Sequence, residues 1–211
     1  AYSTNGGKNW EREDDEYIAH SESEFGFSET FGLKNFYDKQ WMASDYSNSK
    51  YRGNVYLSLS RLSNETNAAI EIYTKNKDSS VFSDTAVAAN TSDDYELLQF
   101  SQIDVDSEGN VHVLFYGTKE NVTNSLYHTV STDGGKTFEP ETKITDFTFA
   151  GGRMLPGDSN DSTIGLSPDR LYPCPQMAVD KYSEEHSGNI YVTFTAVGIE
   201  QKEDNGLDIY Y

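Results

Sequence analysis

The feature that most limits how this chain can fold is a strand–turn–strand pattern that occurs three times. In each copy apolar and polar residues alternate, the alternation stops at an aspartate, and it resumes after a Gly-Asn pair. The copies run over residues 41–59, 103–115 and 177–194, and their aspartates are Asp45, Asp106 and Asp180. Period-two alternation broken by Asp and Gly-Asn is typical of a β-hairpin. Three such hairpins indicate an all-β fold made of repeated units.

A second motif lies between these hairpins. Residues 131–138 read Ser-Thr-Asp-Gly-Gly-Lys-Thr-Phe, residues 3–10 read Ser-Thr-Asn-Gly-Gly-Lys-Asn-Trp, and residues 74–82 look like a degenerate copy. We call the two clear copies the Gly-Gly turns. The Asp or Asn can accept backbone N–H groups of its own loop, the glycines supply positive φ, and the aromatic ring packs back on the sheet. These structural residues are Asn5, Gly6, Gly7 and Trp10 in one turn, and Asp133, Gly134, Gly135 and Phe138 in the other.

This motif resembles the Asp-box (BNR repeat) of sialidases and related proteins, and the hairpins between the copies are similar to those of the same family. The resemblance implies a sialidase-like β-propeller of four-stranded blades over a single region, residues 1–211. Residues 8–19 would form a fourth strand, residues 37–88 and 100–145 two blades, and residues 175–211 three further strands. Such propellers typically have about six blades or more. With about three, the chain would be part of a longer polypeptide, which we favour, or a half-ring completed by a second copy.

The resemblance also implies which end of the propeller carries function. In this family the Asp-box turns lie opposite the functional site, so Asn5 and Asp133 would be structural. The opposite end would carry the loops over residues 20–36, 62–67, 89–99, 117–124, 146–173 and 198–205. All the Asn-x-Ser/Thr sequons fall in these loops, at Asn64, Asn90, Asn121 and Asn160. Glycans there would cover the expected binding face, so either the sequons are accidental, which we favour, or the propeller does not use this face.

The longest of these loops, residues 146–173, holds the candidate ligand-binding residues. Arg153 and Arg170 could form a bidentate clamp for a sugar carboxylate, with Tyr172 just before an inner strand. The alternative is that the two arginines pair with nearby carboxylates and hold the loop in place.

The same loop offers a possible calcium site at Asp158, Asn160 and Asp161, although we favour a plain hydrogen-bonded turn as the explanation of these residues. No other cofactor is expected. The four histidines show no metal-ligand spacing. Cys174 is the one cysteine, so no internal disulfide is expected, and we expect it to be a small buried residue.

Charge limits the partners. The chain has 35 Asp and Glu residues against 16 Lys and Arg, for a formal net charge of -19. Such a surface repels phosphate backbones and anionic lipids, so we expect no nucleic-acid partner and no membrane-surface role. No apolar run approaches the ~18 residues that a membrane span needs, so no membrane insertion is expected. The negative electrostatic potential of this surface also opposes the approach of an anionic sugar.

The catalytic residues of a sialidase cannot be assembled from this sequence. That mechanism needs an arginine cluster for the substrate carboxylate, an acidic aspartate, and a tyrosine nucleophile assisted by a glutamate. The family's Arg-Ile-Pro motif is absent, and Gln40-Trp41 and Gln102-Ile103 stand before Asp45 and Asp106 without an arginine. We therefore expect an extracellular or cell-surface module that binds a carbohydrate or protein ligand, or acts as a scaffold. The alternative is an exo-sialidase-type glycoside hydrolase whose remaining site residues lie in blades outside this chain.

Overall fold

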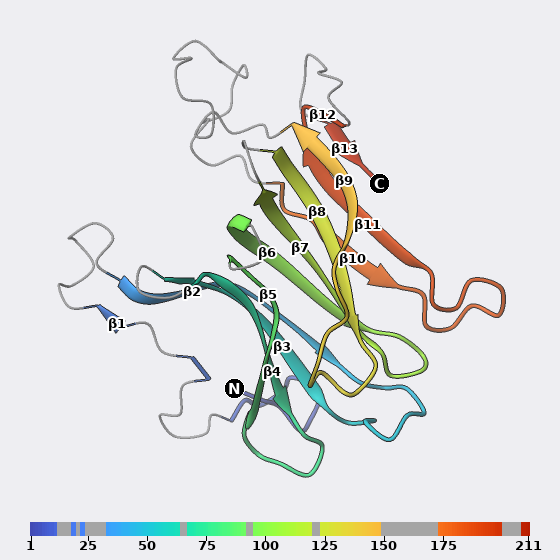
Figure 1. Cartoon of the computed structure of the whole chain (residues 1–211). Coiled ribbons are helices and arrows are strands. Elements are labelled where there is room, and N and C mark those ends of the chain that lie inside the picture. The colour runs from blue at the N-terminus through green and yellow to red at the C-terminus, as the bar shows by residue number, and fades with distance from the viewer. Residues whose placement is uncertain are drawn as a thin grey trace.

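The computed structural model describes residues 1–11, 18–19, 22–23, 33–63, 67–91, 95–119, 123–148, 173–199 and 208–211. These residues form strands and turns, with no α-helix among them, which confirms the all-β class. No helix of the described part could therefore cross a membrane. The strands make three antiparallel sheets in a propeller-like arrangement (Figure 1), which we call blades A, B and C.

Each blade follows the chain order, with two additions at the edges. Blade A has the order β1-β2-β3-β4-β5, with β1 (Glu22–Ser23), β2 (Leu33–Ser44), β3 (Val55–Ser63), β4 (Ala69–Lys75) and β5 (Asp84–Asn90). Blade B has the order β12-β9-β8-β7-β6, with β6 (Tyr95–Val105), β7 (Val111–Lys119), β8 (Thr123–Ser131), β9 (Thr142–Thr148) and the short β12 (Gly198–Ile199). Blade C has the order β10-β11-β13, with β10 (Gln176–Val179), β11 (Ile190–Ala196) and β13 (Asp208–Tyr210).

The three predicted hairpins open these blades. Strand β2 pairs with β3, β6 with β7, and β10 with β11, all antiparallel. The backbone N–H groups of Asp45, Asp106 and Asp180 donate to the carbonyl groups of Asn54, Asn110 and Asn189 at 2.9, 3.0 and 2.9 Å. The pattern of Asp followed by Gly-Asn therefore marks the point where each inner strand turns back. All three hairpin turns lie at the same end of the molecule (Figure 1).

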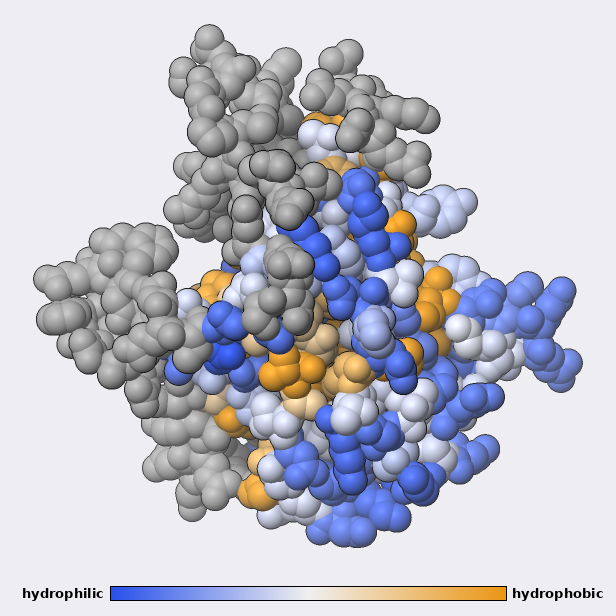
Figure 2. Space-filling view, in the orientation of Figure 1, coloured by the Kyte–Doolittle hydropathy of each residue, from blue (hydrophilic) through white to orange (hydrophobic). Residues whose placement is uncertain are grey.

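The core lies between the blades. On β7, Val111, Val113 and Phe115 belong to the hydrophobic cluster shared with blade A, while Leu114 and Tyr116 belong to the cluster shared with blade C. Alternating side chains of a strand point to opposite faces of the sheet, so blade B is covered on both faces. Strand β6 contacts β2 and β3 on one side and β10 on the other. Apolar residues therefore show mainly between the sheets, while hydrophilic residues dominate over the turns (Figure 2).

The expected fourth strand at residues 8–19 differs in the structure. Within residues 1–11 and 18–19 the pairing is limited to one isolated bridge, in which Tyr2 and Glu11 exchange backbone hydrogen bonds of 2.9 and 2.8 Å. Residues 12–17 lie outside the described part. Strand β12 was also not expected. It follows β11 of blade C in the chain but pairs with β9 of blade B. It thereby extends the outer edge of blade B.

Candidate functional site

The second Gly-Gly turn is held together by its aspartate. Asp133 Oδ1 accepts the N–H groups of Lys136 and Thr137 at 3.0 and 2.9 Å, and Oδ2 accepts the Thr137 hydroxyl at 2.6 Å. Burial alone would raise the pKa of Asp133, but the hydrogen bonds from Thr137, Ser131 and Lys136 lower it to about 2. The carboxylate is therefore occupied by its own turn.

This turn also packs against blade A and so joins blade B to it. Gly134 and Gly135 have φ of +80° and +82°, and a Cβ at Gly134 would lie 2.5 Å from Cε1 of Tyr51 in blade A. Phe138 packs against the core between blades A and B. In the N-terminal turn Asn5 Oδ1 accepts Asn9 N–H at 2.9 Å, yet Trp10 is 67% exposed. The two turns thus have a similar backbone conformation. The aromatic ring of the second turn packs against the core, whereas that of the N-terminal turn is largely exposed.

The hairpin turns at the same end join neighbouring blades as well. Gly109 of the β6–β7 turn lies against Ser47 and Ser49 of blade A. Ser107 and Ser187, from the turns of blades B and C, are hydrogen-bonded through their Oγ atoms at 3.0 Å. Asp104 Oδ2 accepts the N–H of Val179 in blade C at 3.0 Å. This end of the molecule is built from side chains that satisfy one another.

The residues predicted to bind ligand all lie outside the described part, within residues 149–172. They are Arg153, Arg170 and Tyr172 for a carboxylate ligand, and Asp158, Asn160 and Asp161 for calcium. Of the sequons, Asn90 ends strand β5, and Asn64, Asn121 and Asn160 are outside the described residues. These roles stay predictions.

Both arginines within the described residues contact structural partners. Arg52 donates from Nη1 to the carbonyl groups of Tyr46 and Ser47 at 2.5 and 2.7 Å, in the turn of blade A. Arg61 donates from Nε to Glu71 Oε1 at 2.5 Å across β3 and β4. Their cationic groups therefore stabilise the hairpin turn and the sheet of blade A.

Glu71 also accepts the hydroxyl of Tyr73 at 2.8 Å, which makes a Tyr–Glu–Arg group that sequence reasoning missed. Burial and the hydrogen bond to Glu71 raise the pKa of Tyr73. A nucleophilic phenol needs the opposite shift, because it must lose its proton to attack. The group therefore has the chemistry of a buried structural cluster.

A repeated backbone feature marks the inner strands. Lys39, Phe100 and Cys174 have φ of +56°, +56° and +39°, although none is glycine. Each stands six positions before the turn aspartate of its blade. In β2 and β6 the pairing register shifts at this point, as in a β-bulge. The equal distance of these three residues from their turn aspartates can be read from the sequence, but their positive φ cannot.

The surroundings of these three positions differ. Lys39 Nζ lies 5.0 Å from the centroid of the Phe100 ring. Cys174, which stands between two prolines and has a positive φ, is exposed, so the expectation that it is buried was wrong. Next to Phe100, Ser101 Oγ and Gln102 Oε1 are buried and have no hydrogen-bond partner among the described residues. Buried polar atoms are normally paired with protein groups or ordered water, so these two atoms of β6 are exceptions among the described residues.

Two histidines that are well separated in sequence meet in blade B. His112 Nε2 lies 3.3 Å from Asp106 Oδ2, and His112 Nδ1 lies 3.0 Å from His128 Nε2. Burial alone would raise the pKa of Asp106, but hydrogen bonds from Asn110, His112 and Glu108 hold it below its ordinary value. Burial and the nearby His112 lower the pKa of His128 to about 4. No group of three metal-binding side chains occurs within the described ranges.

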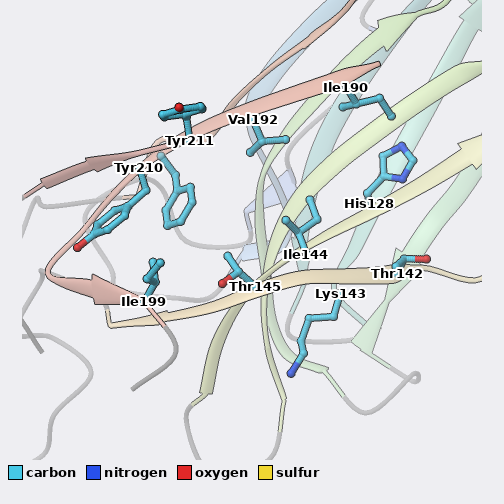
Figure 3. Close-up of a pocket in the computed structure, with 11 residues that line it drawn as sticks. His128, Thr142, Lys143, Ile144, Thr145, Ile190, Val192, Ile199, Tyr210 and Tyr211 are labelled. Atoms are coloured by element: carbon cyan, nitrogen blue, oxygen red, sulfur yellow. The ribbon is translucent and has the colours of Figure 1, made fainter. Parts of the chain in front are cut away.

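His128 also lines a groove of about 460 Å³ between blades B and C (Figure 3). Its walls are mainly apolar, with Ile144 on β9 and Val192 and Phe194 on β11. Tyr210 lines it from β13. The groove lies between sheets, and Ile199, from the predicted loop over residues 198–205, is among its lining residues.

Comparison with known proteins supports the repeat and leaves the activity open. A family model described as BNR/Asp-box repeat matches residues 1–12, which contain the N-terminal Gly-Gly turn. No curated protein and no solved structure matches the chain.

Proposed function

We propose that this chain is a non-catalytic propeller module that binds a carbohydrate or protein ligand outside the cell. The observation that carries the proposal is that, at the end of the molecule where the hairpin turns and the Gly-Gly turns lie, the polar groups are already hydrogen-bonded to one another. There the side chains of Asp106 and Asp133 accept hydrogen bonds from their own turns, and Gly109 and Gly134 lie against blade A. A surface whose polar groups are already paired offers few of them to a ligand. The opposite end is therefore the better candidate for binding.

The described chain leads into residues 149–172 from that opposite end. Strand β9 starts after the second Gly-Gly turn and runs away from it, so its last residue, Thr148, lies at the other end of blade B. Arg153, Arg170 and Tyr172 follow in the chain. Arginine side chains present planar donors that suit a carboxylate or a polar sugar, and tyrosine offers a ring for stacking.

Two observations favour binding over sialoside hydrolysis. The pKa of Tyr73, the tyrosine paired with a glutamate in blade A, is shifted in the direction that disfavours a nucleophile. The net charge of -19 also repels a sialic acid unless local arginines overcome it. Calcium binding by Asp158, Asn160 and Asp161 stays a separate prediction.

A glycan array followed by titration calorimetry tests the proposal. We expect the Arg153→Ala/Arg170→Ala variant to lose at least about tenfold in affinity for the glycan that the array identifies, because a charged hydrogen bond contributes roughly 1.5–3 kcal/mol. Lys136→Ala is the matched control, since Lys136 is an exposed cation at the turn end and should leave binding unchanged.

Two results would count against the proposal. Binding that Lys136→Ala weakens as much as the arginine variant does would place the ligand at the wrong end. Hydrolysis of a fluorogenic sialoside that Arg170→Ala abolishes would replace the binding role by the hydrolase alternative.

A further inference from the structure

The two Gly-Gly turns begin with the same sequence except at a single position. Residues 3–8 read Ser-Thr-Asn-Gly-Gly-Lys, and residues 131–136 read Ser-Thr-Asp-Gly-Gly-Lys. Asn5 therefore stands where the second turn has Asp133, and Gly6 follows it directly. An asparagine before a glycine can lose its side-chain amide spontaneously, because glycine has no Cβ to hinder attack by its backbone nitrogen. The N-terminal turn thus carries a reactive pair whose product has the sequence of the second turn.

The hydrogen bonds of the turn prepare the side-chain amide of Asn5 for this reaction. Asn5 Oδ1 accepts the backbone N–H of Asn9 at 2.9 Å and the hydroxyl of Ser3 at 3.0 Å. Because a backbone N–H is a donor only, the atom that accepts it is the oxygen, and the NH₂ group is the other branch of the side chain. Negative charge develops on Oδ1 when a nucleophile attacks Cγ, and donors already directed at this oxygen stabilise that charge.

The nucleophile is the backbone nitrogen of Gly6. Its N–H has no hydrogen-bond partner among the described residues, and a Cβ at Gly6 would meet nothing within 4 Å. The N–H of Gly134, at the same position of the second turn, is likewise unpaired within the described part, although Gly134 lies against Tyr51 of blade A. The available N–H is therefore a property of the turn itself and does not depend on whether the turn is packed.

We propose that Asn5 is a site of spontaneous deamidation, which converts the N-terminal turn into a second Ser-Thr-Asp-Gly-Gly-Lys turn. The nitrogen of Gly6 loses its proton to a base in the solvent and bonds to Asn5 Cγ. The side-chain NH₂ group takes up a proton and leaves as ammonia, which closes a five-membered imide. A water molecule then opens the ring. Cleavage of the new N–Cγ bond gives aspartate, and cleavage of the original peptide bond gives isoaspartate, so the net reaction consumes one water and releases one ammonia.

The turn favours aspartate as the product. In the second turn Asp133 Oδ1 accepts the N–H groups of Lys136 and Thr137, and Oδ2 accepts the Thr137 hydroxyl. Asn9 stands at the position of Thr137, and its side-chain amide can donate to the new oxygen in the same way. In isoaspartate the main chain runs through Cγ and the carboxylate is attached directly to Cα, so it cannot take this place. The modification therefore completes the turn and adds one negative charge to the -19 of the chain.

Peptide mapping by mass spectrometry tests the proposal on the full chain, incubated at pH 8 with and without urea. Asn5→Asp supplies the authentic product for comparison. Asn205-Gly206 is the other Asn-Gly pair, and in urea it should react at about the rate of Asn5, which shows that the assay measures the intrinsic reactivity of the pair. Without urea Asn5 should react at least as fast as in urea, since the folded turn holds both donors on Oδ1, and a larger share of the product should be aspartate.

A Ser3→Ala variant separates the action of the turn from the reactivity of the dipeptide. It should slow the reaction of Asn5 by about three- to tenfold without urea and leave it unchanged in urea, because only the folded turn places the Ser3 hydroxyl on Oδ1. The effect is smaller than the roughly 10²–10³-fold loss in a closed active site, since this turn is exposed to water. A slower reaction without urea than in urea, an equal share of isoaspartate under both conditions, or a Ser3→Ala variant as fast as the parent chain would overturn the proposal.

Discussion

Replacing Gly109 by alanine is the sharpest test of how the blades are joined, because the chain supplies its own control. Gly109 and Gly188 occupy the same position in the hairpin turns of blades B and C, and both have φ of +88°. A Cβ at Gly109 would lie 2.5 Å from Ser49 Cβ and 2.9 Å from Ser47 Oγ, whereas a Cβ at Gly188 meets nothing within 4 Å. The two substitutions differ in the contact between blades and share the backbone strain.

The magnitude follows from these terms. Left-handed backbone costs an ordinary residue roughly 1–2 kcal/mol, and the stiffer unfolded chain returns about 0.4–1 kcal/mol. Gly188→Ala should therefore lower the free energy of unfolding by about 1 kcal/mol. Gly109→Ala adds an overlap that costs roughly 1–3 kcal/mol, and it disturbs the bonds of Ser49 to Asp45 Oδ2 and Tyr51 N–H, at about 1 kcal/mol each. We expect a total of about 4–6 kcal/mol.

Urea unfolding at one protein concentration measures the difference, with the slope m as the check that the same surface unfolds. In the Gly109→Ala background, Ser49→Gly removes the overlapping atoms, so the double variant should be more stable than the two single losses predict, by at least about 1 kcal/mol. Equal effects of Gly109→Ala and Gly188→Ala would refute the reasoning, because they would mean that the turns of blades A and B do not touch.

Two further predictions concern the titratable groups. Asp133→Ala should lower the free energy of unfolding by about 2–4 kcal/mol, because the N–H groups of the turn lose a charged acceptor, and Asp133→Asn should cost less, since Asn5 accepts the matching bond in the N-terminal turn; urea unfolding of both variants checks this, and equal losses would contradict it. Because the folded pKa of His128, about 4, lies below the ordinary histidine value of 6.5, the unfolded state binds the proton first. Stability should therefore fall as pH drops from 6.5 towards 4, by roughly 1–2 kcal/mol after allowance for solvent screening. His128→Gln, which leaves Asp106 and His112 in place, should lose this dependence in unfolding curves at pH 7.5 and 5; an unchanged slope would contradict it.

The hairpins and the Gly-Gly turns could be predicted because their signals are local. Asp45, Asp106 and Asp180 mark turns whose geometry depends on residues within the turn itself. The chain order of strands within a blade follows, since each turn reverses the chain. The sequence therefore predicts the sheets well.

Features that depend on the pairing register of the strands, or on the sign of the backbone φ angle, could not be predicted in the same way. The contact of His112 with His128 needs the pairing of β7 with β8, over a separation that no spacing rule covers. The positive φ of Lys39 and Phe100 comes from bulges, and the sequence there shows no glycine to indicate them. Cys174 likewise has a positive φ without being glycine, and its exposure was not predicted.

The contact of Gly134 with Tyr51 has a consequence for how such a protein can grow. The residues that attach blade B to blade A are carried in a turn of blade B, so this unit brings its own contact surface with it. Duplication of a unit then needs no new surface to arise, provided that an aromatic residue such as Tyr51 stands ready in the unit before it. Chains with different numbers of units can descend from one another by copying alone.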